Sequence, residues 1–229
     1  MKPLLSLTIA LGTLLLCSCS PDPEKNHGFS GANNPGGSRA LAAMDASRVF
    51  PDGVPSVIDG ERVSYDASGR VSAIGQAAKF TYLSAEDADK MGYNILLATA
   101  EGTYKLCIND EGWVGYAERE NGERINLAYT LAGYLNHIDW RDPVTDGSGE
   151  LVFYYEYGNL LTGKGTCSYP GYSGRLDVTL SYTNTENPDG IDNRDGLIFM
   201  NHGIGAFDLG GLQWAYYAGM LGKPSRQLP

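Results

Sequence analysis

The pattern that most constrains the fold is a set of short runs in which apolar and polar residues alternate. In the clearest run, residues 176–182, four apolar side chains are separated by polar ones. Residues 103–109 and 125–130 show the same two-residue period. Such a period places every second side chain on one face of a β-strand, so each run predicts a strand with one buried and one solvated face.

Turn sequences separate the alternating runs. Each contains the glycine or asparagine that supplies the positive φ needed in a tight reversal. The turns are residues 66–69, 109–112, 121–122 and 158–159. Because hairpins join strands that follow one another, we expect successive strands to be neighbours in one antiparallel meander. A weak internal repeat, residues 65–71 against 108–114, supports this expectation.

Only two stretches favour helices. Ser84 precedes a run with acidic residues in its first turn, and Gly92 follows as a stop signal. Residues 209–221 are apolar on nearly every side, which is typical of a buried segment. We therefore predict a mainly β fold: a single curved antiparallel meander of hairpins, or open barrel-like sheet. A short helix lies near residues 84–91, and the C-terminal helical or apolar segment packs on the sheet.

The N-terminus carries the pattern of an export signal. Lys2 is followed by an apolar core that is too short to span a bilayer as a stable helix. Cys19 then stands at the end of this core, with Leu16 three positions before it and Ser18 directly before it. A branched apolar residue and a small residue at these positions predict cleavage before Cys19 and lipidation of its thiol. An ordinary signal peptide that happens to contain two cysteines is the alternative.

These features divide the chain into three parts. Residues 1–18 form the lipoprotein signal peptide, and residues 19–48 form the lipidated cysteine and a flexible tether. The tether is rich in Pro, Gly, Asn and Ser, a composition that buries too little apolar surface to order itself. Residues 49–229 form the β-sheet domain. Acyl chains on Cys19 anchor the protein to the lipid bilayer, so we expect an outer membrane lipoprotein of the cell envelope, facing the periplasm or the surface.

Charge and cysteine content limit the partners. The chain has a net charge of −10, and loss of Lys2 with the signal peptide makes it −11. An acidic surface argues against nucleic acid as a partner. Cys107 and Cys167 either pair in the oxidising compartment or remain as small apolar side chains in strands, and the sequence leaves this open. No Cys-x-x-Cys or Cys/His spacing indicates a metal site or a cofactor.

Catalytic chemistry finds little support in the sequence. The closest string to a nucleophile elbow, residues 171–174, lacks the spacing of its second glycine. We therefore interpret the histidines as surface or core residues, and we name no catalytic residue. They are His27, His137 and His202. Residues 189–196 look like a calcium loop but depart from the ligand pattern. We interpret them, and the acidic residues at 139, 142, 146 and 150, as solvated loops.

Aromatic residues are the enrichment that could carry function. Fifteen Tyr and three Trp could form a stacking platform for a glycan or a contact surface for a protein. Cross-strand packing within the sheet is the alternative, and we favour it for most of them. Trp113 and Trp140 each lie beside a turn, so we expect them to be exposed. With Tyr155 they are the candidate binding residues, whereas Trp214 is expected in the core.

The chain also resembles a known group of proteins. The strings that carry the likeness are Tyr65-Asp66-x-x-Gly69-Arg70-Val71 and the closing residues 217–225, Tyr-Ala-Gly-Met-Leu-Gly-Lys-Pro-Ser. They resemble Bacteroidetes-type lipoproteins of unknown function with a porin-like fold. The resemblance covers residues 54–229. It implies a curved antiparallel sheet wrapped around the C-terminal segment, and it implies no activity.

Three hypotheses of function follow. The first is a non-enzymatic binding module, held at the membrane by Cys19, for a glycan or a protein. The second is a structural or assembly lipoprotein with no small ligand. The third is a hydrolase whose site cannot be recognised in the sequence. An exposed aromatic groove would favour the first hypothesis, and a polar surface without such a groove would favour the second.

Overall fold

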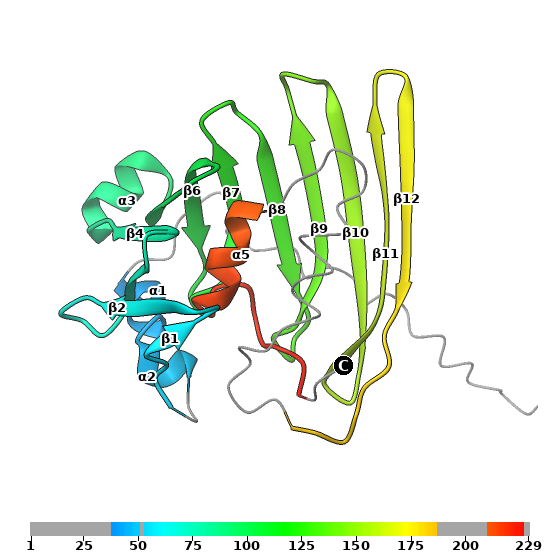
Figure 1. Ribbon diagram of the computed structural model, residues 1–229. Helices are drawn as coiled ribbons and strands as arrows, with labels where there is room; N and C mark the ends of the chain where they lie inside the picture. The colour runs from blue at the N-terminus through cyan, green and yellow to red at the C-terminus, as the bar shows by residue number, and fades with distance from the viewer. Residues whose placement is uncertain (1–37, 51–52, 187–209, 227–229) are drawn as a thin grey trace, which may run out of the picture.

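A twelve-stranded antiparallel sheet dominates the described part of the molecule (Figure 1). The computed structural model describes residues 38–50, 53–186 and 210–226. The strands are β1 Val57–Ile58, β2 Glu61–Tyr65, β3 Val71–Ile74, β4 Ala78–Tyr82, β5 Ile95–Thr99, β6 Gly102–Ile108, β7 Val114–Arg119, β8 Arg124–Tyr129, β9 Leu135–Asp142, β10 Gly147–Glu156, β11 Asn159–Tyr169 and β12 Tyr172–Thr179. They follow one another in sheet order without a crossover, so the predicted meander is confirmed.

The turns between the strands form as their sequences predict. In the β2–β3 turn, the carboxylate of Asp66 accepts hydrogen bonds from the backbone N–H groups of Ser68 and Arg70, each at 2.9 Å. In the β6–β7 turn, the side-chain oxygen of Asn109 accepts from Glu111 and Trp113 in the same way. A short polar side chain thus replaces the missing ladder bonds of the reversal.

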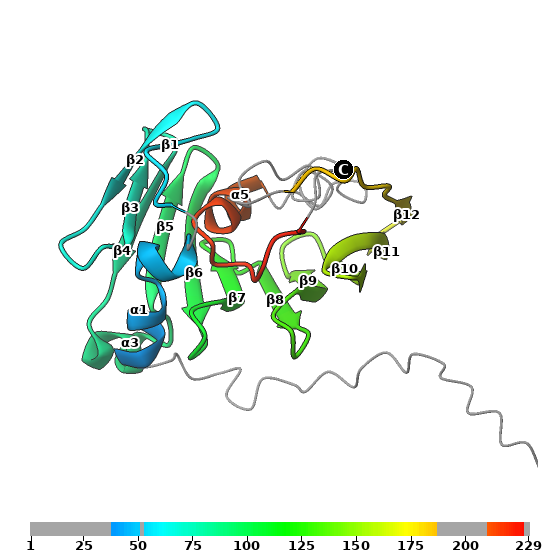
Figure 2. The ribbon, with the colours of Figure 1, turned by 90° about the horizontal axis from the view of Figure 1, so that it is seen from below.

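Bulges bend the sheet into a curved wall. The register shifts at Tyr154/Tyr155 in β10, at Cys107/Ile108 in β6 and at Ala128/Tyr129 in β8. An extra residue on one strand increases the local twist and bends the strand. Seen from below, the sheet wraps around α5 (Gly210–Tyr217), which lies on its concave side (Figure 2).

The core lies between the concave face and α5. Ile95, Leu97, Leu106 and Ile125 point inward and are fully buried. A Cβ atom added at Gly211 would stand 2.0 Å from the ring of Tyr104, so the start of α5 rests directly on that ring. The prediction of a C-terminal segment packed on the sheet is therefore confirmed, although the helix ends at Tyr217.

The predicted helix near residues 84–91 is also present, as α3 (Ala85–Met91). The hydroxyl of Ser84 accepts a hydrogen bond from the N–H of Asp87 at 3.1 Å. Gly92 ends the helix in the left-handed conformation, with φ of +78°. Ala88 on its inner side is buried. Within the described residues, no helix combines the length and the apolar character needed to cross a bilayer.

The predicted boundary between tether and domain, at residue 49, is too late. Two short helices, α1 (Ser38–Ala43) and α2 (Ala46–Val49), precede it. Met44 and Ala46 are 3% exposed, and Phe50 is 7% exposed, because they join the core. The predicted domain begins where the strand-like alternation begins. The segment before that point forms helices, so it lacks the two-residue period that marks a strand. The signal peptide, Cys19 and the tether up to residue 37 lie outside the described residues.

The two cysteines of the sheet do not form a disulfide. Cys107 in β6 and Cys167 in β11 are both free and buried, with β7, β8, β9 and β10 between their strands. The alternative of two small apolar side chains in strands therefore holds.

Candidate ligand-binding cleft

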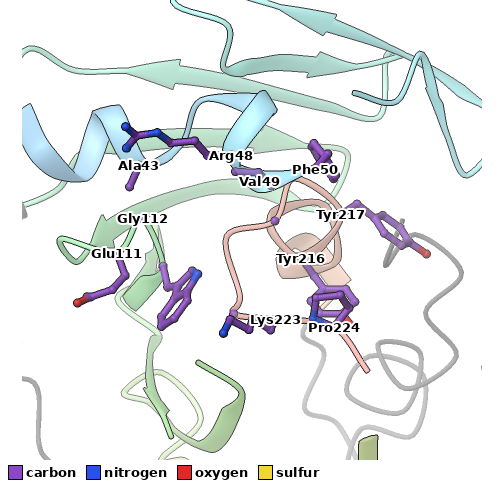
Figure 3. A pocket seen from close by; sticks show the side chains of 13 residues that line it. Ala43, Arg48, Val49, Phe50, Glu111, Gly112, Tyr216, Tyr217, Lys223 and Pro224 are labelled. Carbon is purple, nitrogen blue, oxygen red and sulfur yellow. The ribbon is translucent and has the colours of Figure 1, made fainter. Parts of the chain in front are cut away.

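Three segments that are distant in sequence meet at one end of the sheet and enclose a cleft of about 340 Å³ (Figure 3). The first wall is the helical segment that ends at Phe50, and the second is the β6–β7 turn. The third wall is the end of α5 together with the C-terminal segment that follows it, residues 216–224. We call this space the three-segment cleft. Side chains that line it include Arg48, Glu111, Trp113, Tyr216, Tyr217 and Lys223.

Hydrogen bonds to the sheet hold the C-terminal wall in place. The carbonyl of Met220 accepts from the N–H of Val114 at 2.8 Å, and the N–H of Lys223 donates to the carbonyl of Gly133 at 2.8 Å. Further along, the N–H of Arg226 donates to the carbonyl of Gly158 at 3.1 Å. The segment thus crosses from the β6–β7 turn to the β8–β9 turn and on to the β10–β11 turn, and it is tied to each.

Glycines allow the three walls to approach one another. Gly219, with φ of +74°, lies so close to α2 that an added Cβ would be 1.9 Å from a methyl carbon of Val49. Gly112 has φ of +85°, and its added Cβ would be 3.1 Å from the Cβ of Ala43. Gly219 needs the left-handed conformation and a missing side chain at once, and Gly112 needs the left-handed conformation and leaves little room for a side chain. These two glycines therefore allow the walls to pack closely.

Trp113 is the aromatic side chain best placed to contact a ligand. It is partly buried, and its ring centroid lies 5.2 Å from that of Tyr129. The hydroxyl of Tyr129 donates to the carbonyl of Val114 at 2.7 Å, and burial raises its pKa well above the ordinary value. Tyr129 is therefore neutral at physiological pH and supports the indole as a fixed neighbour.

Lys223 lies next to Trp113. An added Cβ at Gly133 would stand 2.5 Å from the outer edge of the indole and 3.2 Å from the Cε of Lys223. Both side chains therefore pass over the same glycine. A ring and a cation side by side suit a ligand that has polar groups and one flat apolar face.

The rim of the three-segment cleft carries three charged groups. Arg48 stands on the α2 wall, Glu111 beside Gly112, and Lys223 on the C-terminal wall (Figure 3). All three side chains belong to exposed residues. Within the described ranges, no carboxylate lies within 4.0 Å of the charged nitrogens of Arg48 or Lys223. Both cations thus face solvent, and neither is in an ion pair within the described part of the chain. Arg48 acts at longer range on Asp45, because hydrogen bonds from Ser47 and the charge of Arg48 lower the pKa of that carboxyl.

A second hollow lies on the outer face of β9 to β12. It measures about 810 Å³ and is shallower than the cleft. We call it the outer trough, and Asp139, Arg141, Glu150, Thr166, Ser168 and Arg175 are among its lining residues. Its two carboxylates already have partners: Glu150 accepts from His137 at 2.8 Å, and Asp139 accepts from Asn126 at 2.9 Å. Its two arginines, Arg141 and Arg175, are exposed.

Of the three predicted binding residues, one lines the cleft and two do not. Trp113 lines the three-segment cleft. The expectation that Trp140 is exposed is wrong, since it is 3% exposed on the inner face and lies 5.4 Å from the ring of Tyr169. Trp140 lies opposite the buried Ile125 in the β8–β9 register, so its side chain also points to the inner face. Tyr155 is partly buried, stacks on Tyr134 at 4.8 Å, and does not line the cleft.

Residues considered for chemistry do not converge. His137 lies on the outer face between Glu150 at 2.8 Å and Asp139 at 4.0 Å. Asp142 accepts from Val144 and Thr145 within its turn. No group of three or more His, Cys, Asp or Glu side chains in the described ranges could hold a metal ion. The calcium-like loop at 189–196, His27 and His202 lie outside the described residues.

The sequence analysis missed Arg48, Glu111, Tyr217 and Lys223. Arg48 was assigned to the tether, although Asp45 caps α2 by accepting from the N–H of Ser47 at 2.9 Å. An Asp cap followed by apolar residues at 46, 49 and 50 was the available signal. Lys223 stands in the C-terminal string already singled out, but nothing in a string shows which turn it will meet.

Comparisons with known proteins identify no family. No family model matches the chain, and no curated protein matches it. One structural neighbour is a porin-like protein from Bacteroides uniformis, known from a crystal structure. It is 13% identical, the match covers 73% of this chain and 69% of that chain, and the TM-score is 0.48. A likeness of this size says nothing about a ligand.

Proposed function

We propose that this protein is an outer membrane lipoprotein that is anchored through Cys19 and binds a glycan or protein ligand in the three-segment cleft. The single observation that carries the binding proposal is the meeting of Trp113 and Lys223 over Gly133. An aromatic ring and a cation side by side in a concave site supply a stacking surface and an orienting charge. The anchor rests on the spacing of Leu16, Ser18 and Cys19.

Binding fits the described residues better than catalysis does. The groups that line the three-segment cleft are aromatic rings, two cations and one carboxylate, Glu111. A general acid and base or a nucleophile beside its base would require a second titratable partner in contact with the first. A ligand site requires only complementary shape and a few polar groups.

The anchor is tested by lipid labelling of the full-length chain in a bacterial host. We expect labelled palmitate to be incorporated into the unmodified chain and into Cys17→Ser, and to be absent from Cys19→Ser. Cys17→Ser is the matched control because it removes the neighbouring thiol of the same segment. Labelling of Cys19→Ser would show that the anchor has been assigned to the wrong residue.

The binding site is tested with the full-length protein in detergent, immobilised and exposed to a panel of glycans and to envelope proteins. We expect retention of a ligand that is lost in Trp113→Ala and kept in Tyr154→Ala. Tyr154 is the control because it is an aromatic side chain, 45% exposed, on β10 and outside the cleft. Equal retention by both variants would remove the ligand from the three-segment cleft.

A further inference from the structure

The rim of the three-segment cleft has a charge opposite to that of the molecule. The whole chain carries a net charge of −10, yet two of the three ionic groups at the rim, Arg48 and Lys223, are cations. Some other cations of the described residues, such as Lys105 and Arg70, lie against carboxylates, Glu118 at 3.0 Å and Asp66 at 2.6 Å, whereas others, such as Arg141, are in no ion pair either. Solvent-facing cations without such a partner are available to an anionic ligand.

The size of the cleft limits the class of ligand. A volume of about 340 Å³ is at the lower end of the range for small-molecule sites, roughly 300 to 1,000 Å³. A protein partner would need an interface of roughly 800 Å² on each side. A short stretch of a sugar chain fits the smaller space, because one face of a sugar ring is apolar and can stack on Trp113.

From the proposed function, on which this step rests, we infer that the ligand is an acidic glycan. Its sugar ring stacks on Trp113, and its carboxylate or sulfate groups pair with Arg48 and Lys223. Glu111 accepts hydrogen bonds from sugar hydroxyls at the same rim. Arg48 offers a planar fork that matches a carboxylate, and Lys223 adds a point charge.

The acidic surface of the molecule limits non-specific binding of an acidic glycan. A polyanion is repelled by most of a chain with a net charge of −10, so adsorption that ignores the cleft is disfavoured. Retention of an acidic glycan therefore reports a local cationic site. Such retention weakens as salt is added, because the rim charges are exposed to solvent.

The experiment measures binding of four polymers to the full-length protein in detergent by calorimetry. Polygalacturonate supplies carboxylates and dextran sulfate supplies sulfates, while methyl-esterified polygalacturonate and unmodified dextran are their neutral forms. We expect at least one acidic polymer to bind about tenfold more tightly than its neutral form. The double variant Arg48→Gln, Lys223→Gln should bind it at least about tenfold more weakly.

The matched control removes the same charge elsewhere. Arg62→Gln with Lys79→Gln deletes two exposed cations that do not line the cleft, and it should bind as the unmodified chain does. Melting temperatures of both double variants verify the fold.

If acidic and neutral forms bind equally and both depend on Trp113, the proposed function stands and the acidic ligand is wrong. If an acidic peptide such as polyglutamate binds more tightly than every glycan, the sugar class is wrong. If no polymer binds and the Trp113→Ala variant retains every ligand of the panel, both proposals fail.

Discussion

The two hollows of the molecule are built in different ways. The outer trough lies on four consecutive strands, and its outward side chains follow the register of the ladder, which sets Glu150 opposite Asp139 and diagonal to His137. The three-segment cleft lies where α2, a hairpin turn and the C-terminal segment cross, and its cations Arg48 and Lys223 face solvent. The smaller hollow is the better candidate for binding, because it is the more enclosed of the two and places Trp113 beside Lys223.

This difference follows from the geometry of a sheet. Register determines which side chains lie opposite one another, at about 5 Å, and in the outer trough it sets two carboxylates, Glu150 and Asp139, opposite each other. Segments that cross a sheet are not governed by its two-residue period. Their side chains meet at whatever angle the crossing gives, which leaves groups available at the surface. In this molecule, the crossing of the C-terminal segment creates the site and the ladder provides the support.

Replacing Trp140 or Trp113 by alanine should give the largest contrast. Trp140 is 3% exposed and covers Gly149, so Trp140→Ala should lower the free energy of unfolding by about 3 to 5 kcal/mol. Trp113 is only partly buried, and Trp113→Ala should cost about 1 to 2 kcal/mol. Denaturant unfolding followed by circular dichroism measures both values. Equal losses would show that the cleft tryptophan belongs to the core.

Two glycines in the left-handed conformation distinguish the cost of backbone strain from the cost of a steric clash between the cleft walls. Gly219 and Gly171 have similar φ values, +74° and +81°. Nothing lies within 4 Å of an added Cβ at Gly171, so Gly171→Ala should cost about 1 kcal/mol, from strain alone. Gly219→Ala also drives a methyl into Val49 and should cost about 2 to 4 kcal/mol in total. Thermal unfolding of the two variants tests this, and similar losses would mean that α2 moves aside freely.

Much of the fold was predictable because it depends on local patterns. Alternation and turn chemistry gave the strands around Leu106 and Leu127 and the hairpins at Gly69 and Gly112, and these determine a meander. The helix after Ser84 was predictable from its cap and from Gly92. Each of these signals acts within a few residues, so a sequence displays it directly.

The site was only partly predictable because it depends on distant segments. Trp113 was selected for its place beside a turn, and the same reasoning selected Trp140 wrongly. The two differ in their position relative to a strand. Trp140 lies within β9, which continues to Asp142, and its pairing with the buried Ile125 places it on the inner face. Arg48 and Lys223 come together with Trp113 only through the crossing of the walls. No period in the sequence encodes such a crossing.

A smaller effect concerns alkaline pH at the outer face. Burial raises the pKa of the Cys107 thiol to about 11 and that of the neighbouring Tyr116 to about 12. Above pH 9 the unfolded chain therefore loses protons that the folded chain keeps, so stability should fall as the pH rises from 9 toward 12. Melting temperatures across this range measure the decline. Cys107→Ala should lessen its first part, and an unchanged profile would contradict the burial of the thiol.

The smallest effect compares a charge removed from each hollow. Glu150→Gln breaks the contact with His137, but the Glu150 side chain is 57% exposed, so the loss should stay below about 1 kcal/mol. Arg48→Gln removes a cation that is in no ion pair among the described residues and acts on Asp45 only at longer range, so it should lower the free energy of unfolding less than Glu150→Gln does. Urea unfolding at low and high salt compares the two, because salt should reduce the effect of Glu150→Gln. A larger loss from Arg48→Gln would mean that this cation stabilises the fold and is less available to a ligand.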